Sequence, residues 1–133
     1  MLFTEAFRAL GYELLAPRTD WSADSASGVC LSLWAKEIKY SGGVCTFDTR
    51  RDAQPIGTWN RKPGFKRRFE HLVRAVEEFD SAVDAIVVSG TPGGSYEDAT
   101  PWRPEERKGM KWFVTALDRE SGQFAAETRQ VGV

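Results

Sequence analysis

The chain has 133 residues, a mass of 14.9 kDa and a formal net charge of −1. Its 41% hydrophobic and 28% charged residues are typical of a globular protein and exclude a disordered chain, and its longest apolar runs are far too short to cross a membrane. Two cysteines without CxxC spacing and a single histidine exclude the usual zinc sites.

The length and the N-terminal residues predict one cytoplasmic domain that covers residues 1–133. A chain of this size can bury a sizeable core without metal or disulfide staples. The opening stretch MLFTEAFRALGYELL contains Glu5 and Arg8 and lacks the cleavage pattern of a signal peptide, so we expect it to be part of the fold.

A short helix and two hairpins are expected in the first third of the chain. Thr4 can cap a helix that runs through about Leu10. Residues 20–34 hold two short runs separated by SASG, and the second alternates side chains as a strand does. Residues 37–47 predict another reversal, which turns at SGG.

The most regular pattern lies in residues 63–79 and predicts an amphipathic helix. Its apolar side chains recur at spacings of three and four, which places them on one stripe. They are Phe65, Phe69, Leu72, Val73, Val76 and Phe79. Pro63 suits the start of a helix, and Glu70 precedes Arg74 by four positions on the outer face. Residues 48–62, rich in polar groups, are expected to form a loop.

The C-terminal half is expected to be mostly strands. Residues 84–90, DAIVVSG, predict a buried strand that forms a strand–helix–strand crossover with the preceding helix. Residues 91–107 predict a long loop with one helical turn after Pro104, and residues 111–131 predict a closing hairpin. Together the elements predict an α+β fold: a twisted, mostly antiparallel sheet with one main helix packed across it.

The cations of the chain are concentrated in residues 50–74. Eight Lys and Arg side chains against two acids give this segment a net charge of +6, which leaves −7 for the rest of the chain. A cationic patch attracts phosphates and releases counterions when it binds them. We therefore expect phosphate contacts from Arg50, Arg51, Arg61, Lys62, Lys66, Arg67 and Arg68.

Two tryptophans are candidates for stacking on nucleic-acid bases. Trp59 lies inside the basic segment, and Trp102 lies in the predicted loop of residues 91–107. Aromatic rings among cations are typical of surfaces that stack unpaired bases. If the two loops meet, the two rings could hold a flipped base between them.

A second chemistry is suggested by Glu37 and Lys39, which form an E-x-K tripeptide. In metal-dependent nucleases, such a tripeptide and a nearby aspartate hold Mg²⁺ and the attacking water. The aspartate could come from Asp20, Asp24 or Asp48. A serine hydrolase is not indicated, because Ser22 has no nucleophile-elbow motif and His71 is expected on the surface of the helix.

Several motifs resemble those of a family of small uncharacterised bacterial proteins. They are Trp21-Ser22, Leu33-Trp34 followed by Glu37, and a closing L-D-x-x-S-G-x-F-x-A-E hairpin from Leu117 to Glu127. The order of elements is also similar to that of the N-terminal module of McrA-type restriction enzymes. This second resemblance implies recognition of modified bases in DNA, without the nuclease half of those enzymes.

The sequence thus predicts a non-catalytic module that binds DNA or RNA, with modified or flipped bases as its possible target and no metal or other cofactor. The first alternative is a protein-interaction or inhibitor module, for example in a defence system, whose charged faces meet a protein partner or a second copy in a homodimer. The second alternative is the Mg²⁺-dependent nuclease that uses Glu37 and Lys39. No membrane partner is expected.

Overall fold

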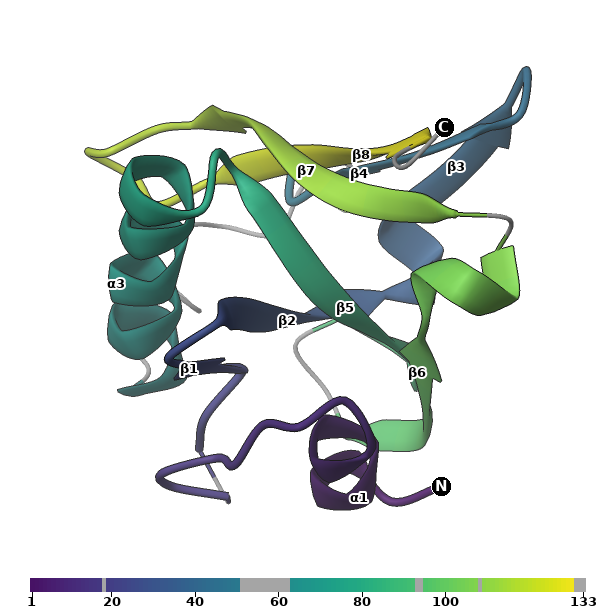
Figure 1. The fold of residues 1–133 in the computed structure, drawn as a ribbon. Helices are drawn as coiled ribbons and strands as arrows, with labels where there is room; N and C mark the ends of the chain where they lie inside the picture. The colour runs from purple at the N-terminus through teal and green to yellow at the C-terminus, as the bar shows by residue number, and fades with distance from the viewer. Residues whose placement is uncertain (18, 51–62, 93–94, 108, 131–133) are drawn as a thin grey trace.

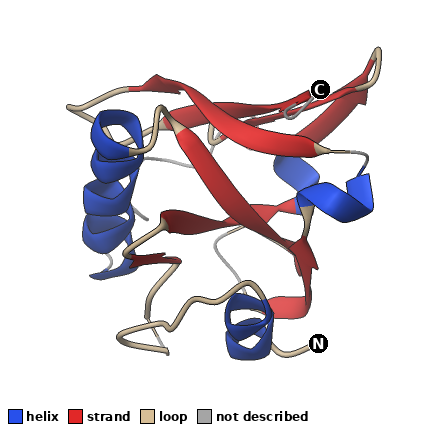
Figure 2. Cartoon of the chain, viewed as in Figure 1, coloured by secondary structure: helices blue, strands red, loops and turns tan. Residues whose placement is uncertain are grey.

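The computed structural model describes residues 1–17, 19–50, 63–92, 95–107 and 109–130. Its elements follow the chain in this order: α1 (Phe3–Ala9), β1 (Ser22–Ser25), β2 (Gly28–Trp34), the 3₁₀ turn η1 (Ala35–Glu37), β3 (Ile38–Ser41), β4 (Val44–Asp48), α3 (Pro63–Glu78), β5 (Ala82–Gly90), β6 (Tyr96–Trp102), the 3₁₀ turn η2 (Pro104–Arg107), β7 (Met110–Leu117) and β8 (Phe124–Gln130). Figure 2 separates the helices from the strands by colour. The predicted α+β class is confirmed.

The strands form an open sheet in the order β1-β2-β5-β7-β8-β4-β3, with β6 paired to β5. Among the described strands, β2 and β5 form the one parallel pair, and their connection includes α3 as the predicted crossover requires. The sheet curls so that β7, β8, β4 and β3 lie above β1 and β2, and β5 runs diagonally between the two levels (Figure 1). The helix α3 covers one side of this curl and packs against β1, β2, β5 and β7.

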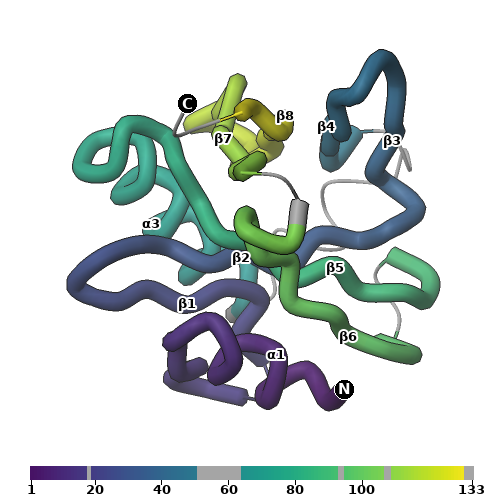
Figure 3. The backbone as a smooth tube through the Cα atoms, turned by 45° about the vertical axis from the view of Figure 1, so that its right-hand side comes forward, coloured from purple at the N-terminus to yellow at the C-terminus, as the bar shows by residue number. Residues whose placement is uncertain are grey.

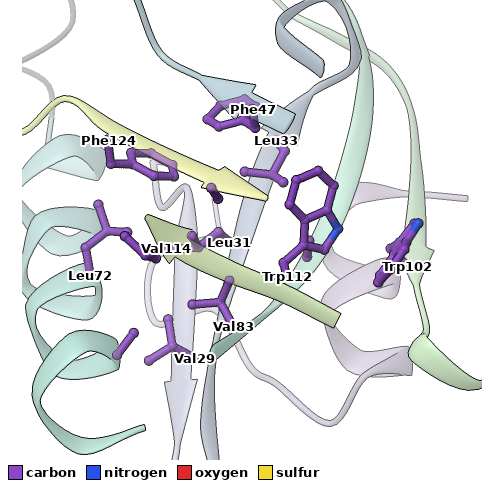
Figure 4. Close-up of a cluster of buried hydrophobic side chains, with 13 residues drawn as sticks. Val29, Leu31, Leu33, Phe47, Leu72, Val83, Trp102, Trp112, Val114 and Phe124 are labelled. Atoms are coloured by element: carbon purple, nitrogen blue, oxygen red, sulfur yellow. The ribbon is translucent and has the colours of Figure 1, made fainter. Parts of the chain in front are cut away.

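Strands β2 and β5 are buried on both faces. The side chains of Val29, Leu31 and Leu33 point into the main core, where they meet α3, β7 and β8 (Figure 4). Cys30 points to the opposite face and joins a second buried cluster with Phe7 of α1. Burial on both faces explains why β5 reads as an apolar run, and why Cys30 and Ser32, which alternate with the core residues of β2, are also buried.

Both predicted hairpins of the first third are present. Strands β1 and β2 pair in an antiparallel register that matches Ser25 with Gly28, and β3 and β4 pair around Gly42 and Gly43. Both glycines of the second turn have positive φ, 60° and 83°, the left-handed conformation that a two-residue hairpin turn requires. The closing hairpin of β7 and β8 is also as expected.

Two expectations about local structure are wrong. The helix α1 begins at Phe3 rather than after Thr4, and the backbone N–H of Leu2 donates to the Glu5 carboxylate. Part of the predicted loop 91–107 forms β6, which pairs with β5 on one side only. As an edge strand, β6 can contain Pro101, whose missing N–H would disrupt a central strand.

Candidate nucleic-acid interface

The predicted phosphate contacts divide into two groups. Arg51, Arg61 and Lys62 lie outside the described residues, as does the stacking candidate Trp59. Arg50 follows the end of β4, whereas Lys66, Arg67 and Arg68 are consecutive on α3. Because consecutive helical residues point in directions about 100° apart, the three α3 cations have three different surroundings.

Lys66 lies on the outward face of α3 and is exposed. Within the described part of the chain it forms no ion pair. Among the described cations of the basic segment, Lys66 is therefore the one that is most available to an external anion.

The flank of α3 that faces the β1 hairpin is occupied by an intramolecular ion-pair network. The Nε atom of Arg67 lies 3.0 Å from Oδ1 of Asp20, whose side chain is only 2% exposed. The second carboxylate oxygen of Asp20 accepts a hydrogen bond from the backbone N–H of Ala16 at 2.8 Å. Two turns farther along, Arg74 donates to Asp24 at 2.7 Å and to Glu78 at 2.6 Å. Arg67 thus holds the segment that precedes β1 against the helix, and Arg74 holds β1 itself.

Arg68 is buried, with 8% of its surface exposed. Its guanidinium lies over the ring of Trp21 at 4.8 Å and the ring of Phe124 at 5.2 Å. Burial lowers the pKa of Arg68 to about 10, and the nearby carboxylate of Glu37 opposes that shift. Arg68 is thus a core residue with cation–π and ionic contacts and cannot serve as a surface phosphate contact.

His71 is buried rather than on the helix surface, which corrects the sequence-based expectation. Its Nδ1 atom lies 2.6 Å from Oγ of Ser22, and its Nε2 atom lies 3.4 Å from Oδ1 of Asp24. Burial lowers the pKa of His71, and the adjacent Arg67 lowers it further, while the carboxylates of Asp24 and Asp20 raise it. Serine, histidine and aspartate are the residue types of a hydrolytic triad, but Ser22 is fully buried and no substrate can reach its hydroxyl.

The other predicted contacts are placed as follows. The guanidinium of Arg50 binds Asp48 through two hydrogen bonds, Nε to Oδ1 at 3.0 Å and Nη2 to Oδ2 at 2.9 Å, and its side chain remains 63% exposed. Trp102 is buried in the main core, where it packs edge-on against Trp112 with ring centroids 5.8 Å apart. This position gives Trp102 a packing role and no open ring face for a base.

The geometry does not favour the E-x-K nuclease site. Glu37 lies in η1 and is buried close to Arg68, whereas Lys39 lies on β3 and is exposed. All three candidate aspartates, Asp20, Asp24 and Asp48, are paired with arginines. Among the described residues, no group of three or more His, Cys, Asp or Glu side chains is arranged to hold a metal ion.

A hollow of about 270 Å³ marks the acidic end of α3. It lies between the turn of the β1–β2 hairpin and the α3–β5 turn, and its charged lining residues are Glu78, Asp80, Asp84 and Lys111. Three carboxylates against one ammonium group would repel a polyanion here. Any nucleic-acid contact is therefore expected at the opposite end of the helix.

Comparison of the chain with protein-family models, with curated proteins and with solved structures gives no match. Within the described residues, no helix has both the length and the apolar character needed to cross a membrane.

The basic residues of α3 are evident in the sequence, but their acidic partners are not. Arg67, His71 and Arg74 recur at spacings of four and three, which puts them on one flank of α3. Asp20 and Asp24 bracket the short segment DWSAD. The spacing of the basic residues on α3 and the spacing of the two aspartates were the features of the sequence that could have predicted the ion-pair network.

Proposed function

We propose that this chain binds nucleic acid without catalysis, through the N-terminal half of α3 and the basic segment that precedes it. Lys66 and the exposed part of Arg67 would contact phosphates, and the exposed Arg50 would add a contact after β4. Trp59 is the remaining candidate for base stacking, while Trp102 is not part of the proposal. The resemblance to a DNA-reading module agrees with this proposal but rests on the order of elements.

One observation carries the proposal: the charges of α3 oppose its own dipole. The first turn has no acidic side chain and the last turn no basic one. Instead, Lys66 and Arg67 lie near the N-terminus, and Glu77 and Glu78 close the helix. Because acids at the N-terminus and bases at the C-terminus would each add about 0.3–1 kcal/mol, helix stability does not account for this order. A positive helix end with exposed cations is, however, suited to an anionic ligand.

The engaged arginines do not remove this surface. The side chain of Arg67 is 38% exposed although it contacts Asp20. A guanidinium has five N–H donors, so a bond to one carboxylate leaves donors for a phosphate. Lys66 adds a compact charge that can follow the phosphate backbone.

The test is a fluorescence-anisotropy titration of duplex DNA and of the same sequence as a single strand, at about 50 mM and about 200 mM salt. We expect binding that weakens steeply with salt. The variant Lys66→Glu should bind several-fold more weakly and show a salt slope smaller by about one. The matched control is Lys39→Glu, since Lys39 is an exposed lysine on β3, across the molecule from α3 (Figure 3).

Absence of binding at low salt would reject the proposal. Equal losses in Lys66→Glu and Lys39→Glu would also reject it, because they would indicate a nonspecific response to net charge rather than a surface on α3.

A further inference from the structure

The outward stripe of α3 has a charge order that is complementary to itself. Lys66, Glu70, Val73 and Glu77 recur at spacings of four, three and four, which aligns them along one face of the helix. Lys66, Glu70 and Glu77 are exposed, and Val73 is half-buried. The exposure of the three charged side chains indicates that this outward stripe is on the side of α3 that faces solvent.

An antiparallel arrangement of two such helices would bring opposite charges together. A two-fold axis across α3 near Leu72 places Lys66 beside Glu77 of a second copy, and the symmetry repeats the same pair at the other end. The same axis places Arg67 two residues, about 3 Å along the helix, from Glu78 of the second copy on the neighbouring flank. Lys66 and Glu77 are about 16 Å apart along the helix, at about 1.5 Å per residue. Both ends can therefore be occupied at once, with Glu70 of each copy opposite Val73 of the other near the axis.

We propose that the outward stripe of α3 is a docking surface for a second copy of this chain, which binds in antiparallel orientation through reciprocal Lys66–Glu77 pairs. A second copy is the occupant that the charge order selects, because the cations near one end of the helix have their anions at the matching positions of the copy.

The present contacts of these side chains leave them available for the exchange. Glu77 is 61% exposed, and its intramolecular partner, Nη1 of Arg119, is 3.7 Å away. Glu78 is 57% exposed while it binds Arg74. Exposed ion pairs are individually weak and are screened by salt. The dimer is therefore concentration-dependent and dissociates as the ionic strength rises.

The test is sedimentation velocity of the isolated protein from about 10 µM to about 1 mM, without nucleic acid. The variants are Lys66→Glu and Glu77→Lys. Each variant alone puts like charges opposite each other in the proposed dimer and is expected to remain monomeric. In their equimolar mixture, positions 66 and 77 are both acidic in one variant and both basic in the other, so opposite charges meet at both ends. The mixture is therefore expected to form a heterodimer at least as readily as the unmodified chain dimerises.

Lys39→Glu is the matched control and is expected to dimerise like the unmodified chain. The inference is overturned if the unmodified chain stays monomeric over the whole range. It is equally overturned if both single variants still dimerise, since the contact would then lie elsewhere. No nucleic acid is present, so neither result depends on the proposed DNA binding. Lys66 cannot pair with Glu77 of a second copy and contact a phosphate at the same time, so the dimer and the DNA contact exclude each other at this residue.

Discussion

The Oγ atom of Ser22 lies 2.6 Å from Nδ1 of His71, and both side chains are sealed between β1 and α3. Together with Asp24 and Arg74, they form a polar chain across the interface between the hairpin and the helix. Such a chain aligns two elements, because each of its members loses a partner when the elements separate.

Substitution Ser22→Ala is expected to lower the free energy of unfolding by about 1–3 kcal/mol, because it leaves Nδ1 of His71 buried without its partner. Urea unfolding followed by circular dichroism measures this loss. The control is Ser27→Ala, which removes an exposed hydroxyl in the hairpin turn and should change stability by less than about 0.5 kcal/mol. Equal effects in the two variants would contradict a buried hydrogen bond.

Ser22 is expected to resist a fluorophosphonate probe in the folded protein. Its hydroxyl has no exposed surface, and the probe must reach Oγ to react. Intact-mass spectrometry of the treated protein measures the modification. A stoichiometric adduct that disappears in Ser22→Ala would contradict the prediction. It would show that the interface between β1 and α3 opens, and it would support a hydrolase activity.

Acidification should destabilise the fold through His71. Burial lowers the folded-state pKa below the ordinary value of 6.5, so folding favours the neutral ring. This contribution to stability is complete above pH 6.5 and is lost as the pH falls through the folded-state pKa. Because this is the only histidine, its NMR titration is unambiguous, and His71→Gln should flatten the pH dependence of unfolding above about pH 5, where carboxylates stay ionised. An NMR pKa at or above 6.5 would contradict the prediction.

Replacement of Arg68 by Met is expected to cost about 3–5 kcal/mol, because it leaves the buried carboxylate of Glu37 without its nearby cation. Adding Glu37→Gln should recover part of the loss, a coupling that a double-mutant cycle measures. In contrast, Arg50→Met removes an exposed ion pair and should cost about 1 kcal/mol or less. If the losses of unfolding free energy in Arg68→Met and Glu37→Gln simply add in the double variant, the coupling between the two side chains is refuted.

Gly64 is expected to tolerate no side chain, although alanine is normally the better helix former. A Cβ atom at this position would lie 2.8 Å from the ring of Trp21 and too close to the carbonyl oxygen of Thr19. Overpacking of this kind typically costs about 1–3 kcal/mol, so Gly64→Ala should lower the melting temperature by several degrees. A stabilised Gly64→Ala protein would show that α3 can move away from the loop before β1.

The elements that were predicted well from the sequence are those buried on one whole face or on all sides. The helix α3, strand β5 and the three hairpins have clear periods of 3.6 or two, or continuous apolar runs, because the core acts on each side chain directly. Strand β6 escaped detection, since an edge strand lies partly in solvent and therefore retains acids and Pro101.

The candidate site was harder to predict because charge along a chain does not reveal its partners. Arg67 and Asp20 are separated by 46 intervening residues and meet only after β1 has docked on α3. Trp102 stands between Pro101 and Arg103 in the sequence but is a core residue in space, since β6 pairs it with Ala85 of a central strand. Such long-range contacts follow from the topology and leave no local pattern.

Strand β5 is shared by both levels of the curled sheet, since it pairs with β2 along one edge and with β7 and β6 along the other. Between the end of its parallel partner β2 and the start of β5 lie 47 residues, so the centre of the sheet closes late in folding and contributes a high contact order. Once formed, this seam ties the two levels into one cooperative unit. The amide protons of residues 84–88 are therefore the ones whose exchange with solvent will report global unfolding.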